Sequence, residues 1–189
     1  MKKILIPLDN EMAKSVDIDH DGTPLLTSKR IYLRGWEDED FPHYLDLVSD
    51  SERMQYVGAG AMTTVQAQTE YRQMCEQWIT RGIGIFVIAM RENNKPLGFT
   101  GLFESALLDE PELCWSLFPG SEGMGYASEA AALARDWSYR ERNIGPLMSL
   151  VHPENQPSRA VAERLGASIE RESAWLGNPR LVYRHVVPM

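Results

Sequence analysis

A glycine-rich turn followed by a helix is the segment of this sequence with the clearest chemical potential. The turn runs from Pro119 to Gly125, and a helix is predicted to begin at Tyr126. The first N–H groups of a helix have no partners within the helix and lie at the positive end of its dipole, so they bind phosphate oxygens well. Gly123 and Gly125 would let a phosphate approach the backbone closely. The segment favours a pyrophosphate site, with an ordinary turn as the alternative.

Several side chains could carry protons. His152 follows a predicted strand, and imidazole side chains titrate near neutral pH, so it is a candidate general base as well as a candidate structural histidine. Glu104 and Glu112 could each accept a proton from an ammonium group, directly or through water, although carboxylates are also common on surfaces. The two cysteines, Cys75 and Cys114, lie far apart without CxxC spacing, which disfavours a zinc site or a disulfide.

Strand and helix signals along the chain predict an α+β fold. Strands are predicted at 30–34, 84–90, 97–103, 112–118, 147–151 and 181–187. Helices are predicted from 41, from 63 or 64 to 82, from 126, and from 157 to 166. In the third helix alanines recur on one face, which lets a helix lie close to a sheet. The order β-α-α-β-β-β-α-β-α-β corresponds to helices on a mostly antiparallel sheet.

Size and charge set bounds on the architecture and the partners. A chain of 189 residues with 43% hydrophobic residues is expected to form one domain with a sizeable core. Lys and Arg total 19 against 27 Asp and Glu, a net charge of -8, so nucleic acid is not expected as a partner. The acidic balance weakly favours a cationic substrate.

Residues 1–22 are expected to form an N-terminal extension to a domain at 23–189. The apolar run at the start ends at Pro7, too soon for a signal peptide, and no stretch elsewhere reaches membrane-spanning length, so no membrane partner is expected. The polar, acidic segment from Leu8 to Gly22 lacks a clear period and is expected to wrap on the surface or to be disordered. Together with the cysteine usage, these features indicate a reduced, cytoplasmic setting.

Two motifs resemble one family of enzymes. Residues 123–130 read GMGYASEA, which resembles the pyrophosphate-binding motif of the GNAT acetyltransferase superfamily, particularly its branch of ribosomal-protein alanine N-acetyltransferases (RimJ/RimL-type). Residues 153–158 (PENQPS) and 163–166 (ERLG) are similar to that branch's PENxxS…EKLG element. Residues 26–34 (LTSKRIYLR) match its entry strand more weakly.

The resemblance implies a GNAT fold that uses acetyl-CoA as co-substrate. The fourth and fifth predicted strands, 112–118 and 147–151, would splay apart, and the pantetheine arm would lie between them. Its main-chain contacts, including one N–H that polarises the thioester carbonyl, would come from Cys114, Trp115, Ser116 and Leu117. The pyrophosphate would bind Glu122, Gly123, Met124, Gly125, Tyr126 and Ala127. Asn155 would hydrogen-bond the pantetheine amide or, as an alternative, cap the following helix.

Two departures from the family pattern bear on the chemistry. Gly120 stands where a Gln or Arg often opens the pyrophosphate motif, so one side-chain contact is lost while the backbone cradle survives. Ala162 stands where many members carry the tyrosine that protonates the departing thiolate. The resemblance makes Ser158 the candidate for that acid role, with a cofactor contact or a plain helix-start serine as alternatives. Glu112 is the preferred general base, because the family often places a glutamate at the start of this strand.

The sequence therefore predicts an N-acetyltransferase that passes the acetyl group of acetyl-CoA to a primary amine, on a protein N-terminus or a small molecule, by direct attack in a ternary complex. No metal is expected. A non-catalytic acyl-CoA-binding module is the main alternative. Another kind of nucleotide-phosphate-binding protein fits less well, because the loop is neither a P-loop ending in GKS or GKT nor a GxGxxG loop. The acceptor and the oligomeric state stay open, and a homodimer is compatible with the sequence.

Overall fold

The computed structural model describes residues 2–4, 16–18 and 22–187. Its main sheet has eight strands in the order β3-β4-β5-β6-β7-β8-β10-β9. These strands are β3 (Leu26–Thr27), β4 (Ile31–Arg34), β5 (Ile85–Met90), β6 (Pro96–Phe103), β7 (Glu112–Leu117), β8 (Met148–Val151), β9 (Ser168–Trp175) and β10 (Asn178–Arg184). Neighbouring strands are antiparallel except β7 and β8, which are parallel. The predicted α+β fold with a mostly antiparallel sheet is confirmed.

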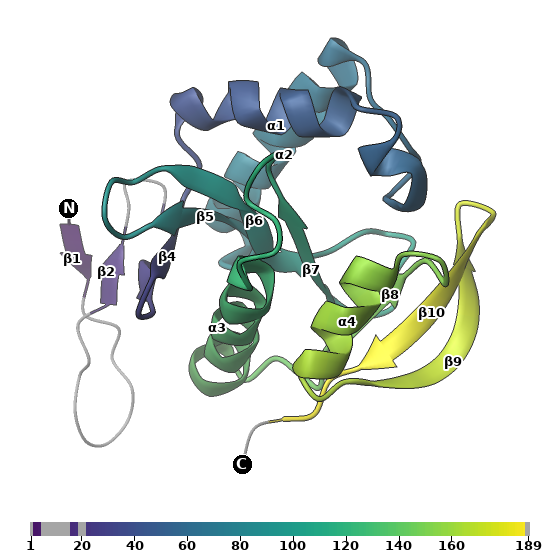
Figure 1. Ribbon diagram of the computed structural model, residues 1–189. Coiled ribbons are helices and arrows are strands. Elements are labelled where there is room, and N and C mark those ends of the chain that lie inside the picture. Colours follow the sequence, from purple (N-terminus) through teal and green to yellow (C-terminus); the bar gives the residue numbers. More distant parts are fainter. Residues whose placement is uncertain (1, 5–15, 19–21, 188–189) are drawn as a thin grey trace.

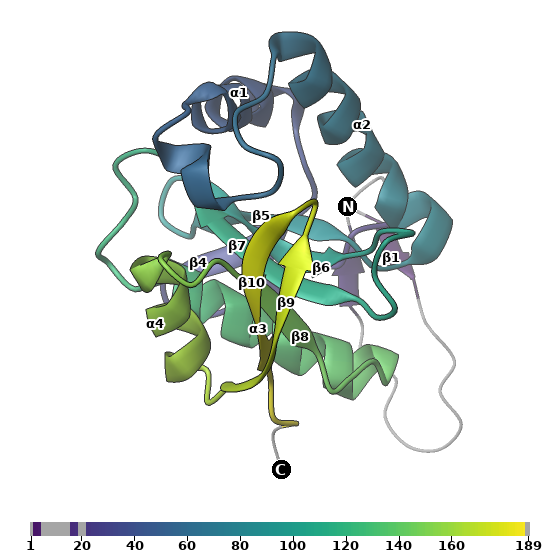
Figure 2. The ribbon, with the colours of Figure 1, turned by 90° about the vertical axis from the view of Figure 1, so that its right-hand side faces the viewer.

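Helices cover both faces of this sheet. They are α1 (Phe41–Ser49), α2 (Thr64–Arg81), α3 (Tyr126–Arg142) and α4 (Gln156–Arg164), with short 3-10 turns η1 (Asp38–Asp40) and η2 (Arg53–Tyr56) around α1. Helices α1 and α2 lie on one face, and α3 lies on the other face beside α4 (Figures 1 and 2). Among the described residues, no helix has both the length and the apolar character needed to cross a bilayer.

The ends of α2 follow local sequence signals. Thr63 caps the helix by accepting a hydrogen bond from the main-chain nitrogen of Gln66, while the Gln66 side chain accepts one from the nitrogen of Thr63. This reciprocal capping box stabilises a helix start by roughly 1 kcal/mol. Gly82 ends the helix in the left-handed conformation, with φ of 66°, which glycine adopts without steric cost. Both ends lie where the sequence predicted them.

The two faces of the sheet bury different side chains. On the α3 face, a stripe of small residues packs the helix closely against the strands: Ala127, Ala130, Ala131 and Ala134. On the α1 and α2 face, Trp36 packs edge-on against Tyr44 and Tyr71, with ring centroids 5.7 and 5.0 Å apart. The aromatic residues on this face of α2 are therefore core, as their helical spacing indicates.

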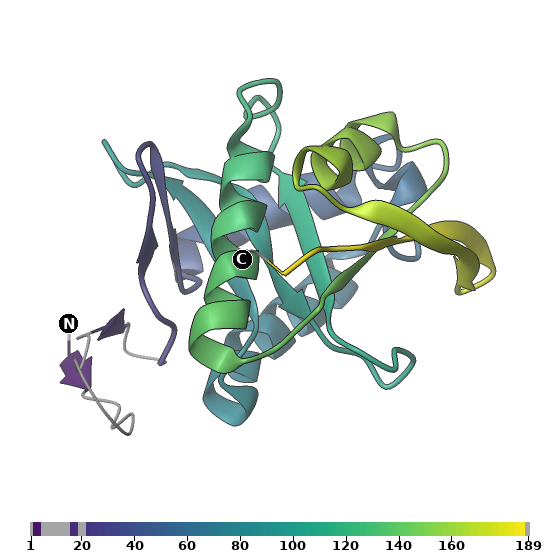
Figure 3. The same ribbon diagram turned by 90° about the horizontal axis from the view of Figure 1, so that it is seen from below.

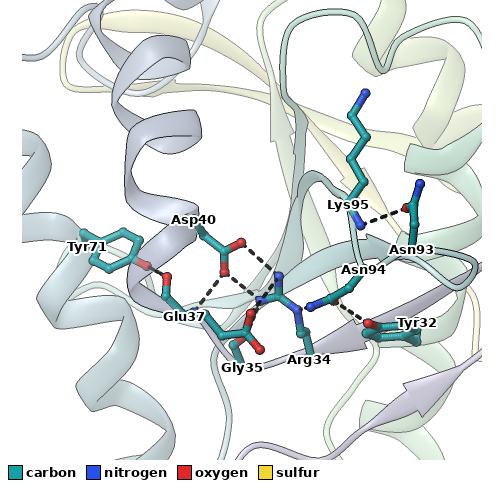
Figure 4. Close-up of polar contacts among 9 residues, drawn as sticks. All are labelled: Tyr32, Arg34, Gly35, Glu37, Asp40, Tyr71, Asn93, Asn94 and Lys95. Carbon is teal, nitrogen blue, oxygen red and sulfur yellow. Dashed lines mark hydrogen bonds and ion pairs between the residues drawn. The ribbon is translucent and has the colours of Figure 1, made fainter.

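A buried ion pair fixes the chain between β4 and α1 (Figure 4). The guanidinium of Arg34 donates to both carboxylate oxygens of Asp40, at 2.6 and 2.9 Å, and both side chains are at most 5% exposed. Burial by itself lowers the pKa of Arg34, but the hydrogen bonds and charge of Asp40 outweigh it, and the pKa is raised. The same carboxylate accepts a hydrogen bond from the nitrogen of Glu37, so one buried pair sets the direction in which α1 starts.

Strand β9 is the longest of the described strands that the sequence did not predict. Its residues are exposed except for Trp175, so no buried face imposes a hydrophobic period of two. It pairs antiparallel with β10, which begins at Asn178 and ends at Arg184 instead of spanning 181–187. The hairpin of β9 and β10 forms one edge of the sheet (Figure 2).

The N-terminal extension contains a small sheet of its own. Strand β1 (Lys2–Ile4) pairs antiparallel with β2 (Val16–Ile18), apart from the main sheet (Figure 3). Within the segment at 8–22, which was expected to wrap on the surface or to be disordered, residues 16–18 form β2, and the expectation itself stays a prediction. The rest of that expectation, for 8–15 and 19–21, lies outside the described residues. The domain boundary at residue 23 stays a prediction.

Candidate active site

Strands β7 and β8 diverge almost as soon as they meet. Their parallel pairing is described at one position, Glu112 opposite Met148, and β8 then continues beside β10. A cleft of about 330 Å³ lies at this divergence, and α1, α2, the loop after η2 and the β9–β10 hairpin complete its walls. The predicted splay of the fourth and fifth strands is confirmed, because these strands correspond to β7 and β8.

Side chains bridge the point where the two strands part. Glu112 Oε1 accepts a hydrogen bond from the main-chain nitrogen of Leu150, 2.9 Å away. Ser149 Oγ donates to the carbonyl of Leu113 and lies 2.9 Å from Nε2 of His185. Because the single hydroxyl proton of Ser149 is used toward Leu113, the Nε2 atom of His185 must be the donor. Burial lowers the pKa of His185 to about 4, so this imidazole stays neutral.

Glu112 combines burial with access to the cleft. Its carboxylate is surrounded by protein yet lines the cleft and is only partly accessible. Desolvation raises the pKa of Glu112 to about 7, against the opposing effects of the Leu150 hydrogen bond and the charge of Arg180. A carboxylate that titrates near neutral pH can both take up and release a proton, which is what a general base requires.

Alternate main-chain groups of β7 point toward the gap. The hydrogen bond from the nitrogen of Phe118 to the carbonyl of Leu97 fixes which β6–β7 pairs exchange hydrogen bonds. In an antiparallel ladder every second residue directs its N–H and C=O away from the partner strand, so Trp115 and Leu117 direct theirs toward β8. In the part of the chain that the structure describes, no strand pairs with them on that side. Of the four predicted contact residues from Cys114 to Leu117, these two therefore present free main-chain groups.

The glycine-rich loop presents an uncapped helix start. Gly125 precedes α3 in the left-handed conformation, with φ of 78°, and it has no side chain to cap the first N–H groups. Gly123 also has φ of 78°, and a β-carbon added there would meet only open space. The loop from Glu122 to Ala127 therefore offers N–H groups and room to an anion, which fits the pyrophosphate of acetyl-CoA.

Two charged residues brace this loop. Glu122 accepts hydrogen bonds from the nitrogen of Gly120, 2.8 Å away, and from Arg53 of η2. Burial by itself raises the pKa of Glu122, but these hydrogen bonds and the charge of Arg53 together outweigh it, and the pKa is lowered. Arg30 donates to the carbonyl of Met124, 2.9 Å away, and lies over the ring of Tyr126. Arg30, a cation beside the predicted phosphate site, was not among the predicted site residues. Its position just before β4 gave no local signal of that contact.

The start of α4 brings Asn155 and Ser158 to the cleft wall. Asn155 caps the helix, with its Oδ1 accepting a hydrogen bond from the nitrogen of Ser158, 3.2 Å away. Of the two interpretations of Asn155, the cap is the one that the structure contains. Ala162, one turn beyond Ser158, is fully buried against Val151 and Tyr183 and does not line the cleft.

The other proton-carrying candidates have different surroundings. Glu104 forms an ion pair with Arg81 and does not line the cleft. His152 lines the cleft but stacks on Tyr56 at 4.8 Å. Burial raises the pKa of Cys114 well above that of a free thiol, so this side chain stays protonated and is a poor nucleophile.

Two charged residues of the cleft were missed. Glu70 on α2 accepts a hydrogen bond from the hydroxyl of Tyr44, 3.0 Å away, and burial raises its pKa against the opposing effect of that bond. Arg180 on β10 is only 4% exposed. Glu70 is a single polar residue on a mostly polar helix, and Arg180 lies just before the strand that was predicted to begin at 181. Neither position carries a local signal of its tertiary role.

Comparison with known proteins gives a consistent result. Residues 30–168 match the acetyltransferase (GNAT) domain. YnaD, an uncharacterized N-acetyltransferase of Bacillus subtilis, is 26% identical over 145 residues, covering 75% of this chain and 81% of that protein. An acetyltransferase structure from Agrobacterium tumefaciens has a TM-score of 0.79 at 34% identity, covering 86% of this chain and 94% of that chain. RimL, a ribosomal-protein α-N acetyltransferase solved with coenzyme A, has a TM-score of 0.70 at 17% identity, covering 86% and 98% of the two chains, which is a likeness of fold.

Proposed function

The chain belongs to the GNAT acetyltransferase family, and we propose that it acetylates a primary amine by direct attack on acetyl-CoA in a ternary complex. The observation that carries this proposal is the splay of β7 and β8, with Glu112 at its apex and free main-chain groups along one side. The uncapped start of α3 supports it as the site of the pyrophosphate.

Glu112 is the proposed general base. An amine is protonated near neutral pH and cannot attack until it loses a proton. The carboxylate of Glu112 takes that proton, and its raised pKa of about 7 makes it basic enough to do so while a large fraction remains ionised above neutral pH. The hydrogen bond from Leu150 keeps the carboxylate directed along the opening between the strands.

Main-chain groups of β7 hold the acyl donor in this proposal. Acetyl-CoA supplies a thioester whose carbonyl carbon the amine attacks, forming a C–N bond and releasing the thiolate. The N–H of Trp115 or Leu117 donates to the carbonyl oxygen as negative charge develops on it, an interaction worth on the order of 3 kcal/mol in comparable sites. As the C–S bond breaks, Ser158 gives its hydroxyl proton to the departing sulfur and regains one from the attacking nitrogen, which loses its second proton when the amide forms. Cys114 takes no part, because its thiol stays protonated.

A thiol-release assay with acetyl-CoA tests the proposal against a panel of small amines and N-terminal peptides. Release that depends on the amine, with the acetylated product identified by mass spectrometry, is expected. Binding of acetyl-CoA without turnover on any amine would favour the acyl-CoA-binding module, for which Ala162 and Gly120 are the relevant departures. We place the reaction in a reduced, cytoplasmic compartment, because Cys75 and Cys114 lie far apart in the sequence without CxxC spacing, which disfavours a disulfide framework. A homodimer and the absence of nucleic acid and membrane partners stay predictions.

A further inference from the structure

Arg180 is buried in the wall of the cleft without a carboxylate partner. Its described hydrogen bonds go to two main-chain carbonyls, those of Pro179 at 2.9 Å and Gly58 at 3.2 Å. Carbonyl groups orient a guanidinium but do not neutralise its charge. A buried charge is costly unless it is paired, so this arrangement calls for an anion.

Arg34 provides the comparison within the same chain. It is as buried as Arg180, at 4% exposed, but Asp40 binds it with both carboxylate oxygens. For Arg180, no carboxylate lies within ion-pair distance among the residues that the structure describes. The nearest compensation is the longer-range charge of Glu112. Arg180 is therefore the buried arginine that faces the cleft and lacks the partner that Arg34 has.

The cleft thus presents one positive and one negative group to the same ligand. Glu112 has its oxygen fixed by Leu150, and Arg180 is held by Gly58 of the loop after η2 and by its own strand. Both line the same cleft. A ligand with an amine and an anionic group would complement both charges, whereas a polyamine would place a second cation near Arg180.

The remaining wall indicates the size and charge of that ligand. Apolar side chains form most of it, including Met54, Val57, Met62, Met74, Phe103 and Trp175. Glu70 adds a second carboxyl group to the cleft, which disfavours a doubly charged anion such as a phosphate. A single carboxylate matches Arg180 best, because a planar guanidinium binds a carboxylate through two parallel hydrogen bonds.

We infer that the acetyl acceptor is an α-amino acid with an apolar side chain, whose carboxylate binds Arg180 while its amine faces Glu112. This inference rests on the proposed acetyl transfer and makes it specific. A peptide N-terminus carries an amide where the amino acid carries its carboxylate, so Arg180 would remain without an anion. Arg180 is a specificity-determining residue in this arrangement and takes no part in the proton transfers.

Matched pairs of acceptors test the inference. Rates of thiol release from acetyl-CoA are measured with the apolar amino acids, with the corresponding amino acid amides, and with short peptides that begin with the same residues. For the acceptor with the highest kcat/KM, we expect a preference for the free carboxylate over the amide of roughly 10- to 100-fold, as for a hydrogen bond to a charged group. Arg180→Gln should reduce that preference to within a few-fold, because kcat/KM should fall much further for the amino acid than for the amide.

Two controls separate this role from a structural one. Arg171→Gln makes the same charge change on the exposed neighbouring strand and should leave the preference unchanged. Arg180→Lys keeps the charge but loses the paired geometry, so it should retain part of the preference for the free carboxylate. This variant serves as the test if Arg180→Gln folds poorly. Thermal melts with and without acetyl-CoA establish that each variant is folded and binds the donor.

The outcomes are distinguishable. Equal or faster acetylation of amides or peptides, with no change in selectivity in either Arg180 variant, would overturn the inference while the acetyl transfer itself stands. Absence of turnover with every amine in the panel would overturn the proposed function, and this inference with it. A carboxylate preference that disappears in Arg180→Gln and persists in Arg171→Gln supports the assignment.

Discussion

Glu112 on β7 accepts a hydrogen bond from the main-chain nitrogen of Leu150 on β8, with 2.9 Å between the two atoms. In an ordinary parallel strand pair, a main-chain carbonyl of the neighbouring strand would accept the hydrogen bond from this nitrogen. Here a side chain occupies it, so the strands can part immediately beyond Met148 while the carboxylate stays oriented. The same residue therefore opens the cleft and presents a buried acid to it.

Glu112→Gln should lower kcat/KM by roughly two to four powers of ten, because the amide cannot take up a proton. In the unmodified enzyme, kcat/KM should rise with pH and level off above about pH 7, where the carboxyl group is ionised. The variant should lose that ionisation from its pH profile. Glu104→Gln is the matched control, since Glu104 is ion-paired to Arg81 and does not line the cleft. An unchanged profile in Glu112→Gln would assign the base elsewhere.

The same substitution should stabilise the fold at high pH. Burial raises the pKa of Glu112 from 4.5 to about 7, so between these values the folded state keeps a proton that the unfolded state has lost. Stability contributed by this group therefore falls as pH rises through that window and is lowest above pH 7. Glutamine removes the cost of ionisation and can still accept from Leu150. Melting temperatures should favour Glu112→Gln at pH 8 and converge at pH 4, as circular dichroism can measure. A higher melting temperature for the unmodified protein at pH 8 would contradict the raised pKa.

Local signals in the sequence were sufficient to predict most of the elements and the glycine-rich turn before α3. A capping threonine at 63 marks the start of α2, and a left-handed glycine at 82 marks its end. In α3, the alanine stripe comes directly after the glycine-rich turn in the sequence. These features depend on residues within one or two turns of each other, so the chain's own order reveals them. The splay of β7 and β8 could be predicted from the family resemblance, because no local pattern in the sequence indicates it.

The charged groups of the cleft depend on tertiary contacts and could not be predicted in this way. Arg180 reaches Gly58, 122 positions earlier in the chain, and Glu70 meets Tyr44 across two helices. A solvated arginine and a solvated glutamate have the same sequence pattern as these two. Strand β9 was missed for a related reason, because pairing with β10 holds an exposed strand that has no apolar face.

Acetyl-CoA should raise the melting temperature, since a ligand bound only by the native state at a hundred times its dissociation constant adds about 2.7 kcal/mol. Gly123→Val should abolish this shift, because the branched side chain would occupy the open space in front of the loop and resist a φ of 78°. Gly22 has a comparable φ of 88° and open surroundings, and it lies far from the loop in the sequence. Gly22→Val therefore controls for backbone strain alone. An equal rise in melting temperature with acetyl-CoA in both variants would mean that the loop is an ordinary turn.

Asp40→Asn should destabilise the fold by about 3 to 5 kcal/mol, because it removes the buried counter-ion of Arg34 and leaves only the longer ion pair with Glu37, at 3.5 Å. Urea unfolding followed by tryptophan fluorescence measures the difference. Arg171→Gln removes an exposed pair with Glu170 and should change the free energy of unfolding by less than about 1 kcal/mol. A similar loss in the free energy of unfolding in the two variants would mean that the Arg34–Asp40 pair is less desolvated than its burial indicates.

Ser158→Ala should lower kcat by roughly 100-fold or less with little change in affinity for acetyl-CoA, if Ser158 protonates the departing sulfur. The effect lies at the small end of the range for acid catalysis because a thiolate is already a fair leaving group. Isothermal titration with acetyl-CoA and steady-state kinetics on a confirmed acceptor separate this from a binding role, in which affinity and kcat/KM would fall together. Ala162→Tyr is not expected to restore the rate, since Ala162 is fully buried against Tyr183 and a larger side chain there would overpack the interior. Full turnover by Ser158→Ala would leave protonation of the thiolate to water.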